Sequence, residues 1–287
     1  MAKIIGIGEV LFDVFPNGRK LGGAPVNFAY HVNCLGEQGL AVTAVGNDEL
    51  GKEAKDLMKE KKIDGIISTV ESPTGTAVVA LDDEGVPSFT ITEGVAWDVI
   101  PFSDELKTAA ASCDAICFGT LAQRSAVSRN TVRKVLSLVP ESSLVVYDIN
   151  LRQHYYSKSL VEESLKLSNV LKINDDEFRI VRSLLNCPYE DYESESRWLM
   201  NNYGLKMLIL TCGAEGSYVF SEDSVSFEPT PKVKVVDTVG AGDSFTAAFC
   251  VAFLRGLSIK EAHKKAVEVS AFVCTRAGAM PEMPKLL

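Results

Sequence analysis

The sequence lacks the features that mark several common classes of protein. It has only three histidines, at positions 31, 154 and 263, and they show neither a metal-like spacing nor an evident nucleophile partner. No uncharged apolar run approaches the length of a membrane span. There is no internal repeat or linker, and no signal region precedes the first predicted strand, so we expect a cytoplasmic protein that does not contact a membrane.

Two well-known phosphate-binding patterns are also missing. The chain has no G-x-x-x-x-G-K-[ST] string, which excludes a P-loop nucleotide hydrolase. The dinucleotide-binding pattern G-x-G-x-x-G fails at its best candidate turn, because Phe245 stands where the third glycine is needed. An oxidoreductase built on that turn is therefore not supported.

Positive charge is scarce and dispersed. The 287 residues include 29 Lys and Arg against 38 Asp and Glu, which gives a net charge of −9. No cluster of basic residues occurs, so we expect no nucleic-acid partner, although a local site for a small phosphate ligand is compatible with this charge. The seven cysteines are odd in number and scattered, mostly within apolar runs, and we interpret them as reduced core residues.

The pattern of apolar residues predicts an α/β fold that buries a sizeable core. The predicted strands are 3–7, 41–46, 66–70, 115–119, 144–149, 170–173, 206–211, 217–220 and 233–236, and the predicted helices are 25–35, 51–63, 128–138, 161–167, 245–254 and 259–274. Polar candidates fall where strands end, which is where open parallel sheets bind their ligands.

One part of the chain departs from this alternation. Short β segments at 76–81 and 88–92 flank Asp82-Asp83-Glu84-Gly85, a strong hairpin signal. We predict a small β lid over a cleft, built from about 12–21 and 75–97, with Trp97 lining the pocket. The apolar residues Val78, Ala80, Phe89 and Ile91 suggest one face that packs on a second lid in a homodimer.

The most informative segment is Asp237-Thr238-Val239-Gly240-Ala241-Gly242-Asp243-Ser244-Phe245. It lies between the predicted buried strand 233–236 and a long apolar helix. Gly240 and Gly242 allow successive N–H groups to converge on an anion at the helix N-terminus, and Asp243 adds a carboxylate there. The arrangement suits phosphoryl transfer, although a tight turn with Asp243 as a helix cap is the simpler interpretation of the motif alone. The helix N-terminus predicts a low pKa for Asp243.

Five motifs in order along the chain resemble those of the ribokinase-like (PfkB) carbohydrate kinases. They are Gly22-Gly23-Ala24-Pro25-Val26-Asn27, Asp148-x-Asn150-x-Arg152, Asn174-x-x-Glu177, Thr211-x-Gly213-x-x-Gly216 and the segment from Asp237 to Asp243. The resemblance covers essentially the whole chain. It implies a single kinase domain over 1–287, with a central, mostly parallel sheet flanked by helices and a β lid.

The resemblance also implies roles for individual residues in an ATP-dependent sugar kinase. Asp243 would deprotonate the sugar hydroxyl, and the anion hole would be formed by Gly240, Ala241 and Gly242. The sugar would be bound by Asp13, Gly23 and Asn27, with Trp97 and Arg152 in the same pocket. Asn174 and Glu177 would organise the ATP phosphates and Mg²⁺. The nucleotide side would be lined by Thr211, Gly213 and Gly216. Many members bind a monovalent cation such as K⁺, and the matching positions are Asp237, Val239, Val273, Arg276 and Gly278.

The motifs look most like those of the fructokinase branch, which makes fructose the expected acceptor. 2-Keto-3-deoxygluconate kinases also carry an Asp-x-Asn-x-Arg string, in which Arg152 would pair with the carboxylate of a sugar acid. A third alternative is a non-catalytic sugar or nucleotide sensor. Such a protein is expected to lack the base or the anion-hole glycines, whereas this chain has both.

Overall fold

A nine-stranded sheet forms the centre of the molecule in the computed structural model, which describes residues 1–16, 18–81 and 87–284, with backbone alone for 79–81 and 87–89. The strand order is β13-β12-β11-β10-β9-β8-β1-β4-β5. The strands from β11 to β5 in this order run parallel, whereas β12 runs antiparallel to β11 and β13 runs antiparallel to β12. The expected mostly parallel α/β fold is therefore confirmed.

The strands are β1 (Lys3–Ile7), β2 (Leu11–Phe15), β3 (Gly18–Gly22), β4 (Gln38–Gly46), β5 (Asp64–Val70), β6 (Gly75–Leu81), β7 (Pro87–Ile91), β8 (Ala115–Phe118), β9 (Leu144–Asp148), β10 (Val170–Asn174), β11 (Met207–Thr211), β12 (Ser217–Ser221) and β13 (Val225–Glu228). The α-helices are α1 (Ala24–Cys34), α2 (Glu49–Glu60), α3 (Asp104–Ala110), α4 (Ala126–Leu136), α5 (Lys158–Lys166), α6 (Asp175–Leu185), α7 (Tyr192–Tyr203), α8 (Ala241–Leu254) and α9 (Ile259–Cys274), and two short 3₁₀ helices are η1 (Ala96–Val99) and η2 (Leu121–Arg124).

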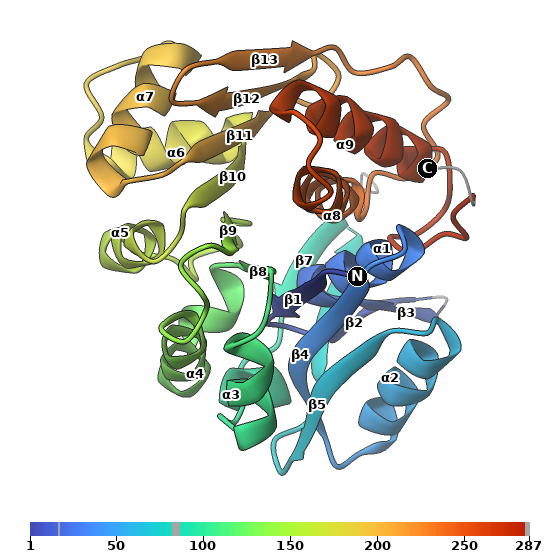
Figure 1. Ribbon diagram of the computed structural model, residues 1–287. Helices are drawn as coiled ribbons and strands as arrows, with labels where there is room; N and C mark the ends of the chain where they lie inside the picture. Colours follow the sequence, from blue (N-terminus) through green and yellow to red (C-terminus); the bar gives the residue numbers. More distant parts are fainter. Residues whose placement is uncertain (17, 82–86, 285–287) are drawn as a thin grey trace.

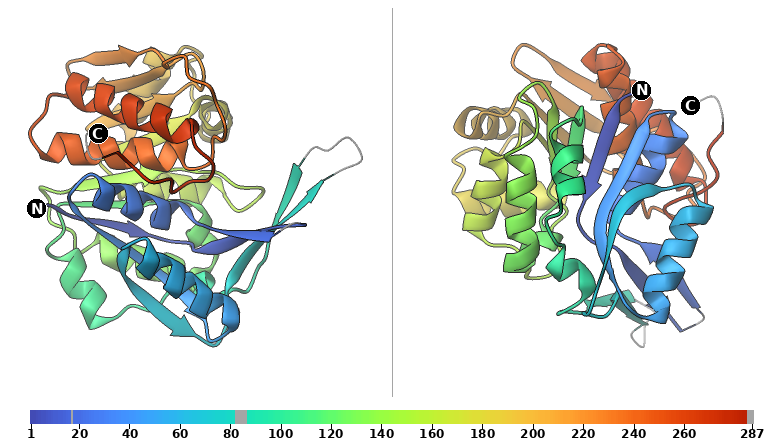
Figure 2. Two further views of the ribbon diagram at one scale, coloured as in Figure 1. Left: turned by 90° about the vertical axis from the view of Figure 1, so that its right-hand side faces the viewer. Right: turned by 60° about the horizontal axis from the view of Figure 1, so that its bottom comes forward.

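Helices cover both faces of the sheet, as Figures 1 and 2 show. Side chains of α1, α8 and α9 pack on one face, where Ile4, Val146 and Ile209 belong to the same cluster. Helices α3 to α7 pack on the opposite face, where the cluster includes Ile116 and Leu171. Because successive side chains of a strand point to opposite faces, strands buried on both sides are apolar throughout, which is why short unbroken apolar runs predicted them.

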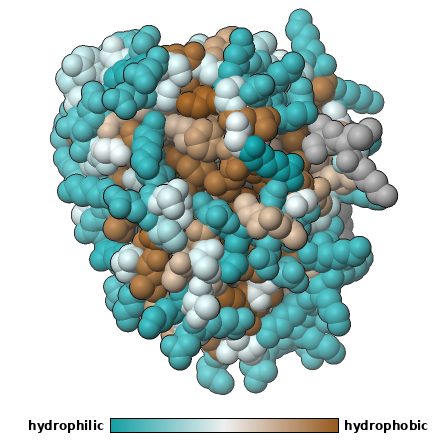
Figure 3. Space-filling model, viewed as in Figure 1, coloured by the Kyte–Doolittle hydropathy of each residue, from teal (hydrophilic) through white to brown (hydrophobic). Residues whose placement is uncertain are grey.

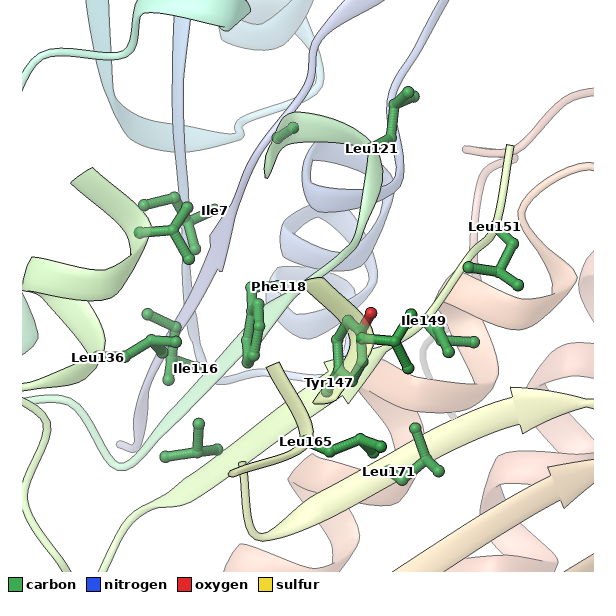
Figure 4. Packing of buried hydrophobic residues seen from close by; sticks show 14 of the residues in the cluster. Ile7, Ile116, Phe118, Leu121, Leu136, Tyr147, Ile149, Leu151, Leu165 and Leu171 are labelled. Carbon is green, nitrogen blue, oxygen red and sulfur yellow. The ribbon is translucent and has the colours of Figure 1, made fainter. Parts of the chain in front are cut away.

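The core on the α3–α7 face is drawn in Figure 4. Phe118 of β8 and Tyr147 of β9 are neighbours in the parallel register, and their rings stack with centroids 5.1 Å apart. Both side chains are fully buried, and the hydroxyl of Tyr147 hydrogen-bonds with the hydroxyl of Thr120 at 2.6 Å. This packing fixes the ends of β8 and β9, which border the candidate site.

A second sheet of four strands, in the order β3-β2-β6-β7, projects beyond the carboxyl ends of the parallel strands (Figure 2, left). It consists of residues 11–15, 18–22, 75–81 and 87–91, close to the segments expected for a lid. The register pairs Val78 with Thr90 and Ala77 with Ile91. Directly paired residues share a face, so Val78 and Ile91 lie on opposite faces, and their exposures are 47% and 7%. The expectation of one shared apolar face is therefore wrong for this pair, and the side chains of Ala80 and Phe89 lie outside the described residues.

The end of the molecule opposite the small sheet carries an apolar hollow. Figure 3 shows apolar side chains gathered in the upper middle of this face. A hollow of about 270 Å³ there is lined by Leu35 beyond α1, by Val251 and Ala252 near the end of α8, and by Val269 of α9. The two ends of α8 therefore differ, because its other end carries the glycine turn.

One predicted element is wrong, and others were missed. Residues 233–236 are neither a strand nor buried, and Val235 and Val236 are each 58% exposed. The backbone N–H of Val236 donates to the carbonyl of Cys274, so the segment is attached to the end of α9 rather than to a sheet. The helices α3, α6 and α7 and the strand β13 were not predicted.

Two further properties of the chain follow from the described residues. Within them, no helix combines the length and the apolar character needed to cross a bilayer. All seven cysteines are free thiols, and Cys113, Cys117, Cys212 and Cys250 are buried as expected. Cys34 is exposed, and Cys187 and Cys274 are only half-buried, so the prediction that all seven are core residues is wrong.

Candidate active site

The glycine turn leads directly into α8. Gly240 is the N-cap residue with φ of 79°, a left-handed conformation, and a Cβ there would lie 2.6 Å from the Cα of Ala279. Only glycine satisfies both conditions. No side chain caps α8, so the first turn presents backbone N–H groups and partial positive charge. The N–H of Ala241 donates to the carbonyl of Thr238 at 3.2 Å and closes the turn.

Asp243 lies in the first turn of α8 and contacts a residue far away in the sequence. The side-chain amide of Asn27, in α1, donates to Oδ2 of Asp243 at 2.8 Å. Desolvation by the surrounding protein, together with the charge of Asp148, raises the pKa of Asp243 to about 7, against the opposing effect of the Asn27 hydrogen bond. The prediction of a low pKa is therefore wrong, because desolvation outweighs the helix N-terminus.

A buried ion pair lies beneath the turn, and only one of its two residues was expected from the sequence. Nζ of Lys172 is 3.0 Å from Oδ1 of Asp148, and the other carboxylate oxygen accepts a hydrogen bond from Thr246 at 3.0 Å. A Cβ on Gly242 would lie 2.9 Å from Nζ of Lys172, so the ammonium group lies against the turn. Burial alone would lower the pKa of Lys172, but the charges of Asp148 and Glu177 raise it, which keeps the cation charged.

The sequence does contain a signal for this lysine. Lys172 stands in the middle of β10, and its neighbours Leu171 and Ile173 are fully buried. A lysine within an apolar strand must bury its charge, which requires a carboxylate partner. Asp148 ends the adjacent strand β9 and pairs with Lys172 in the parallel register.

The residues expected to bind the sugar are arranged around the start of α1. Gly23 is the N-cap with φ of 120°, and a Cβ on it would lie 2.4 Å from the carbonyl oxygen of Glu9. Glu9 follows β1 and is only 4% exposed. Its pKa is raised by desolvation, against the opposing effects of its own backbone N–H, the charge of Arg152 and the N–H of Ala24. Oδ1 of Asn27 is buried without a hydrogen-bond partner and can accept one from a ligand.

Arg152 and Asp13, which are also expected to bind the sugar, are less buried than Glu9. Arg152 is exposed, and Asp13, in β2, is half-buried. Desolvation raises the pKa of Asp13, while the positive charges of Arg152 and Lys20 act in the opposite direction. Arg152 thus acts electrostatically on two carboxyl groups of the protein, Asp13 and Glu9.

Trp97 was expected to line an open pocket, but its side chain is buried. It is fully buried in the main core cluster, and its ring lies over Gly75, where a Cβ would be 2.3 Å from Nε1. The guanidinium of Arg124 lies 3.9 Å from the centre of the indole ring and forms two 2.8 Å hydrogen bonds to Asp98. Trp97 therefore anchors the return from the small sheet to the core.

The residues expected to organise phosphates begin α6. Asn174 ends β10, and its side chain accepts the N–H of Glu177 at 2.8 Å, while Glu177 accepts the N–H of Asn174 at 3.1 Å. This reciprocal capping box stabilises the helix. Oε1 of Glu177 also accepts the N–H of Leu151 at 2.8 Å, which ties α6 to the chain after β9. Their position at the carboxyl ends of adjacent strands suits ligand binding as well.

The loop after β11 contains the third group of expected residues. Thr211 pairs with Asn174 in the parallel register of β10 and β11, so these two residues are adjacent. Gly213 has φ of 52°, and Gly216 has φ of 145°, where a Cβ would lie only 2.6 Å from the carbonyl oxygen of Glu228. The side chain of Thr230 donates to the carbonyl of Gly213 at 2.6 Å and holds the loop.

The expected monovalent-cation residues are partly brought together. Asp237 accepts the N–H of Val239 at 3.0 Å on one carboxylate oxygen and the N–H of Gly278 at 2.9 Å on the other. The carbonyl of Val273 accepts the N–H of Arg276 at 3.0 Å. The carboxylate therefore joins the chain before α8 to the chain after α9. Within the described ranges, no group of three or more His, Cys, Asp or Glu side chains could hold a metal ion.

Together these groups place an uncapped helix N-terminus, a buried ammonium and a carboxylate of raised pKa at one edge of the parallel sheet. The first two stabilise negative charge, and the third can take a proton at neutral pH. This combination serves the transfer of an anionic group to a hydroxyl.

Two relatives are similar in sequence to nearly the whole chain. An uncharacterized sugar kinase from Pyrococcus horikoshii is 29% identical over 297 residues, which cover 96% of this chain and 91% of that protein. A fructokinase from Solanum tuberosum is 28% identical over 304 residues, covering 98% and 92%.

Solved structures share the fold. The Pyrococcus horikoshii sugar kinase in complex with ATP superposes with a TM-score of 0.81 at 27% identity, covering 96% of this chain and 94% of that one. A fructokinase from Vibrio cholerae O395 with fructose, ADP and calcium bound has a TM-score of 0.81 at 22% identity, covering 98% and 95%. The family sequence model of the pfkB family carbohydrate kinases matches residues 8–286 of this chain. With its fold and these sequence relatives in agreement, the chain belongs to the pfkB family of carbohydrate kinases.

Proposed function

We propose that this carbohydrate kinase transfers the γ-phosphoryl group of ATP to a hydroxyl of a neutral sugar, with fructose as the acceptor. The observation that carries the phosphoryl transfer is the position of Asp243 in the first turn of α8, where Lys172 lies against Gly242. The observation that favours a neutral sugar is the pair of carboxyl groups, Glu9 and Asp13, on which the charge of Arg152 acts.

In the proposed reaction, Asp243 accepts the proton of the acceptor hydroxyl, and the oxygen of that hydroxyl attacks the γ-phosphorus atom. The bond between that phosphorus and the bridging oxygen breaks, and ADP leaves. Charge on the transferred group is stabilised by N–H groups of the first turn of α8 and by the ammonium of Lys172. Asn27 holds the carboxylate of Asp243 in place through its 2.8 Å hydrogen bond.

The phosphates and their Mg²⁺ would lie near Asn174 and Glu177, at the start of α6. The carboxylate of Glu177 accepts two backbone N–H groups and retains lone pairs for water. Mg²⁺ usually keeps several waters and binds substrate phosphates, so a cage of protein ligands is not required. A K⁺ ion would lie near Asp237 and Gly278, which the 2.9 Å hydrogen bond brings together.

The nucleotide would lie along the exposed valines that precede the turn. Val235 and Val236 are exposed beside the end of α9, and covering their apolar surface with a nucleobase would be favourable. Thr211 and Gly213 would line the same side of the site.

The acceptor is tested by measuring ADP release with Mg²⁺ and ATP against fructose, glucose, ribose, adenosine and 2-keto-3-deoxygluconate. We expect saturable turnover with fructose, and product analysis then locates the phosphate. A sugar acid brings a negative charge towards Glu9 and Asp13, so we expect no comparable turnover with 2-keto-3-deoxygluconate. Turnover on the sugar acid alone would contradict the proposal and assign Arg152 to carboxylate binding.

We also propose that two chains associate through their small sheets. Val78 supports this contact, because its apolar side chain is exposed on the small sheet. Light scattering at micromolar concentration should give the mass of a dimer, and Val78→Lys should shift it to the monomer. A monomeric mass for the parent protein would contradict this proposal.

A further inference from the structure

A small cavity is lined in part by Asp243. It has a volume of about 20 Å³, and its lining includes Glu9, Asp148 and Asp243, together with Pro25 and Gly119. This volume accommodates a single water molecule, which needs about 10–15 Å³ and two to four polar partners. Three carboxyl groups from different parts of the chain supply acceptors for it. A sugar ring is far too large for this space, which lies beside the start of α1.

The three carboxyl groups of this cavity are not equivalent. Asp148 is neutralised by Lys172 at 3.0 Å and accepts a further hydrogen bond from Thr246. Glu9 is 4% exposed and has no ion-pair partner within salt-bridge distance among the described residues. The positive charge acting on Glu9 belongs to Arg152, which is exposed to solvent. Glu9 is therefore the carboxyl group of the cavity that is free to change its protonation state with Asp243.

We propose that Glu9 is the proton acceptor behind the catalytic base, linked to Asp243 by one water molecule in this cavity. The proposal rests on the role of Asp243 proposed above. When Asp243 has taken the proton of the acceptor hydroxyl, it donates that proton to the water oxygen, and the water donates one of its own protons to the carboxylate of Glu9. Asp243 is again a carboxylate, the water is unchanged and Glu9 is a carboxylic acid. Glu9 returns its proton to solvent once the products leave.

The environment of Glu9 fits this exchange. Desolvation favours the neutral acid, while the N–H groups of Glu9 and Ala24 and the charge of Arg152 favour the carboxylate. A carboxyl group under such opposing influences can both accept and release a proton. The groups that face Asp243 are Asp148 from β9, Lys172 from β10, Asn27 from α1 and Glu9, and Asp243 in turn acts on the thiol of Cys117 in β8. Glu9 and the water complete a path that leads away from the phosphoryl group.

The variant that tests this role is Glu9→Gln, which keeps the size of the side chain but cannot accept the proton. We expect turnover to fall about tenfold to a hundredfold with little change in the KM for ATP, since proton-transfer groups contribute at about this level or above. The solvent isotope effect, measured in mixtures of H₂O and D₂O, should change from a curved dependence on D₂O fraction to a linear one. Glu9→Asp should restore part of the turnover, and a purely structural role would leave the shape of the dependence unchanged.

A second readout does not depend on catalysis. In the ligand-free protein, the titration of Asp243 can be followed by carboxyl ¹³C NMR, with Asp243→Asn to assign the signal. We expect the midpoint to fall in Glu9→Gln, because a neighbouring negative charge has been removed. The matched control is Glu195→Gln in α7, another buried glutamate, whose own pKa desolvation raises to about 7. It should leave the midpoint of Asp243 unchanged.

The outcomes separate this inference from the proposed function. A midpoint of Asp243 that is the same in Glu9→Gln and in the parent, with unchanged turnover, overturns the role of Glu9. Full activity of Asp243→Asn overturns the role of Asp243 as base, while the titration still reports whether the two carboxyl groups are coupled. A crystal structure at high resolution should contain one water within hydrogen-bond distance of both groups, and a dry cavity overturns the proton path.

Discussion

The proposed acceptor side and the proposed nucleotide side of the site are built in different ways. On the acceptor side, polar and charged side chains are bonded to one another: Asn27 to Asp243, and Lys172 to Asp148. On the nucleotide side, glycines and backbone groups dominate, and the valines at 235 and 236 are exposed. Buried charges hold their geometry before a ligand arrives, whereas an open apolar surface is completed by the ligand. The difference suggests that the acceptor side determines chemistry and selectivity, and the nucleotide side contributes mainly affinity.

Replacing Asp243, the proposed base on the acceptor side, should have the largest effect on turnover. We expect Asp243→Asn to lower turnover by about a hundredfold to ten-thousandfold, the range for a general base, with little change in the KM for ATP. Steady-state kinetics on the purified variant measure both quantities. An unchanged turnover in a correctly folded variant would show that Asp243 is not the base.

Breaking the buried ion pair should affect stability as well as turnover. Lys172→Met leaves Asp148 as an uncompensated buried charge, and we expect a loss of about 3–5 kcal/mol in the free energy of unfolding. Denaturant titration measures it. The double variant Lys172→Met with Asp148→Leu removes both charges and should recover most of the stability, but not the turnover. Recovery of turnover in the double variant would contradict the role of the ammonium beside the turn.

The raised pKa of Asp243 predicts how both activity and stability depend on pH. A base with a pKa of about 7 is ionised in only about a tenth of molecules at pH 6, so turnover should rise through neutral pH. The folded protein also holds this proton more tightly than the unfolded chain, so ionisation of Asp243 lowers stability progressively from about pH 4 to pH 7. Asp243→Asn removes that cost, and its melting temperature should exceed that of the parent at pH 8 but not at pH 4. A turnover that is flat between pH 5.5 and 8 would contradict the assignment.

Two glycines allow the contrast to be tested within the backbone. Gly240 and Gly213 both have positive φ, but only Gly240 has an atom within 2.6 Å of the position of a Cβ, whereas Gly213 has nothing within 4 Å. Gly213→Ala should therefore cost about 1–2 kcal/mol of stability from the backbone alone. Gly240→Ala should cost more and lower turnover, because it displaces the turn from Ala279. Thermal melts and kinetics on the two variants give the comparison, and equal effects would show that crowding at the turn is unimportant.

Much of the fold could be predicted from the sequence because the local signals were strong. The apolar run 144–149 is buried on both faces, and the capped helix 259–274 coincides with α9. The run 233–236 failed because β-branched residues favour extended chain without specifying that it joins a sheet. The exposure of this segment results from its attachment to Cys274 at the end of α9, a contact between distant parts of the chain.

The candidate site also has some features that the sequence predicts and others that depend on contacts between distant segments. The glycines at 23 and 240 and the carboxylate at 243 are recognisable from the sequence, since turn geometry and helix N-termini depend on neighbours in the chain. The partnership of Asn27 with Asp243 spans 216 positions in the sequence and could not be predicted from either motif alone. The prediction of a low pKa for Asp243 failed for the same reason, because only folding desolvates Asp243 and brings the charge of Asp148 close to it.

The sequence by itself therefore determined most of the strands and helices, the family and the residue types available for phosphoryl transfer, because these depend on local patterns. The tertiary structure alone decided that Lys172 lies against the glycine turn, that Trp97 belongs to the core, and that Glu9 and Asp243 share a cavity. The physical reason is that burial and electrostatic coupling depend on distance in space, and the fold brings together segments that are remote in the chain.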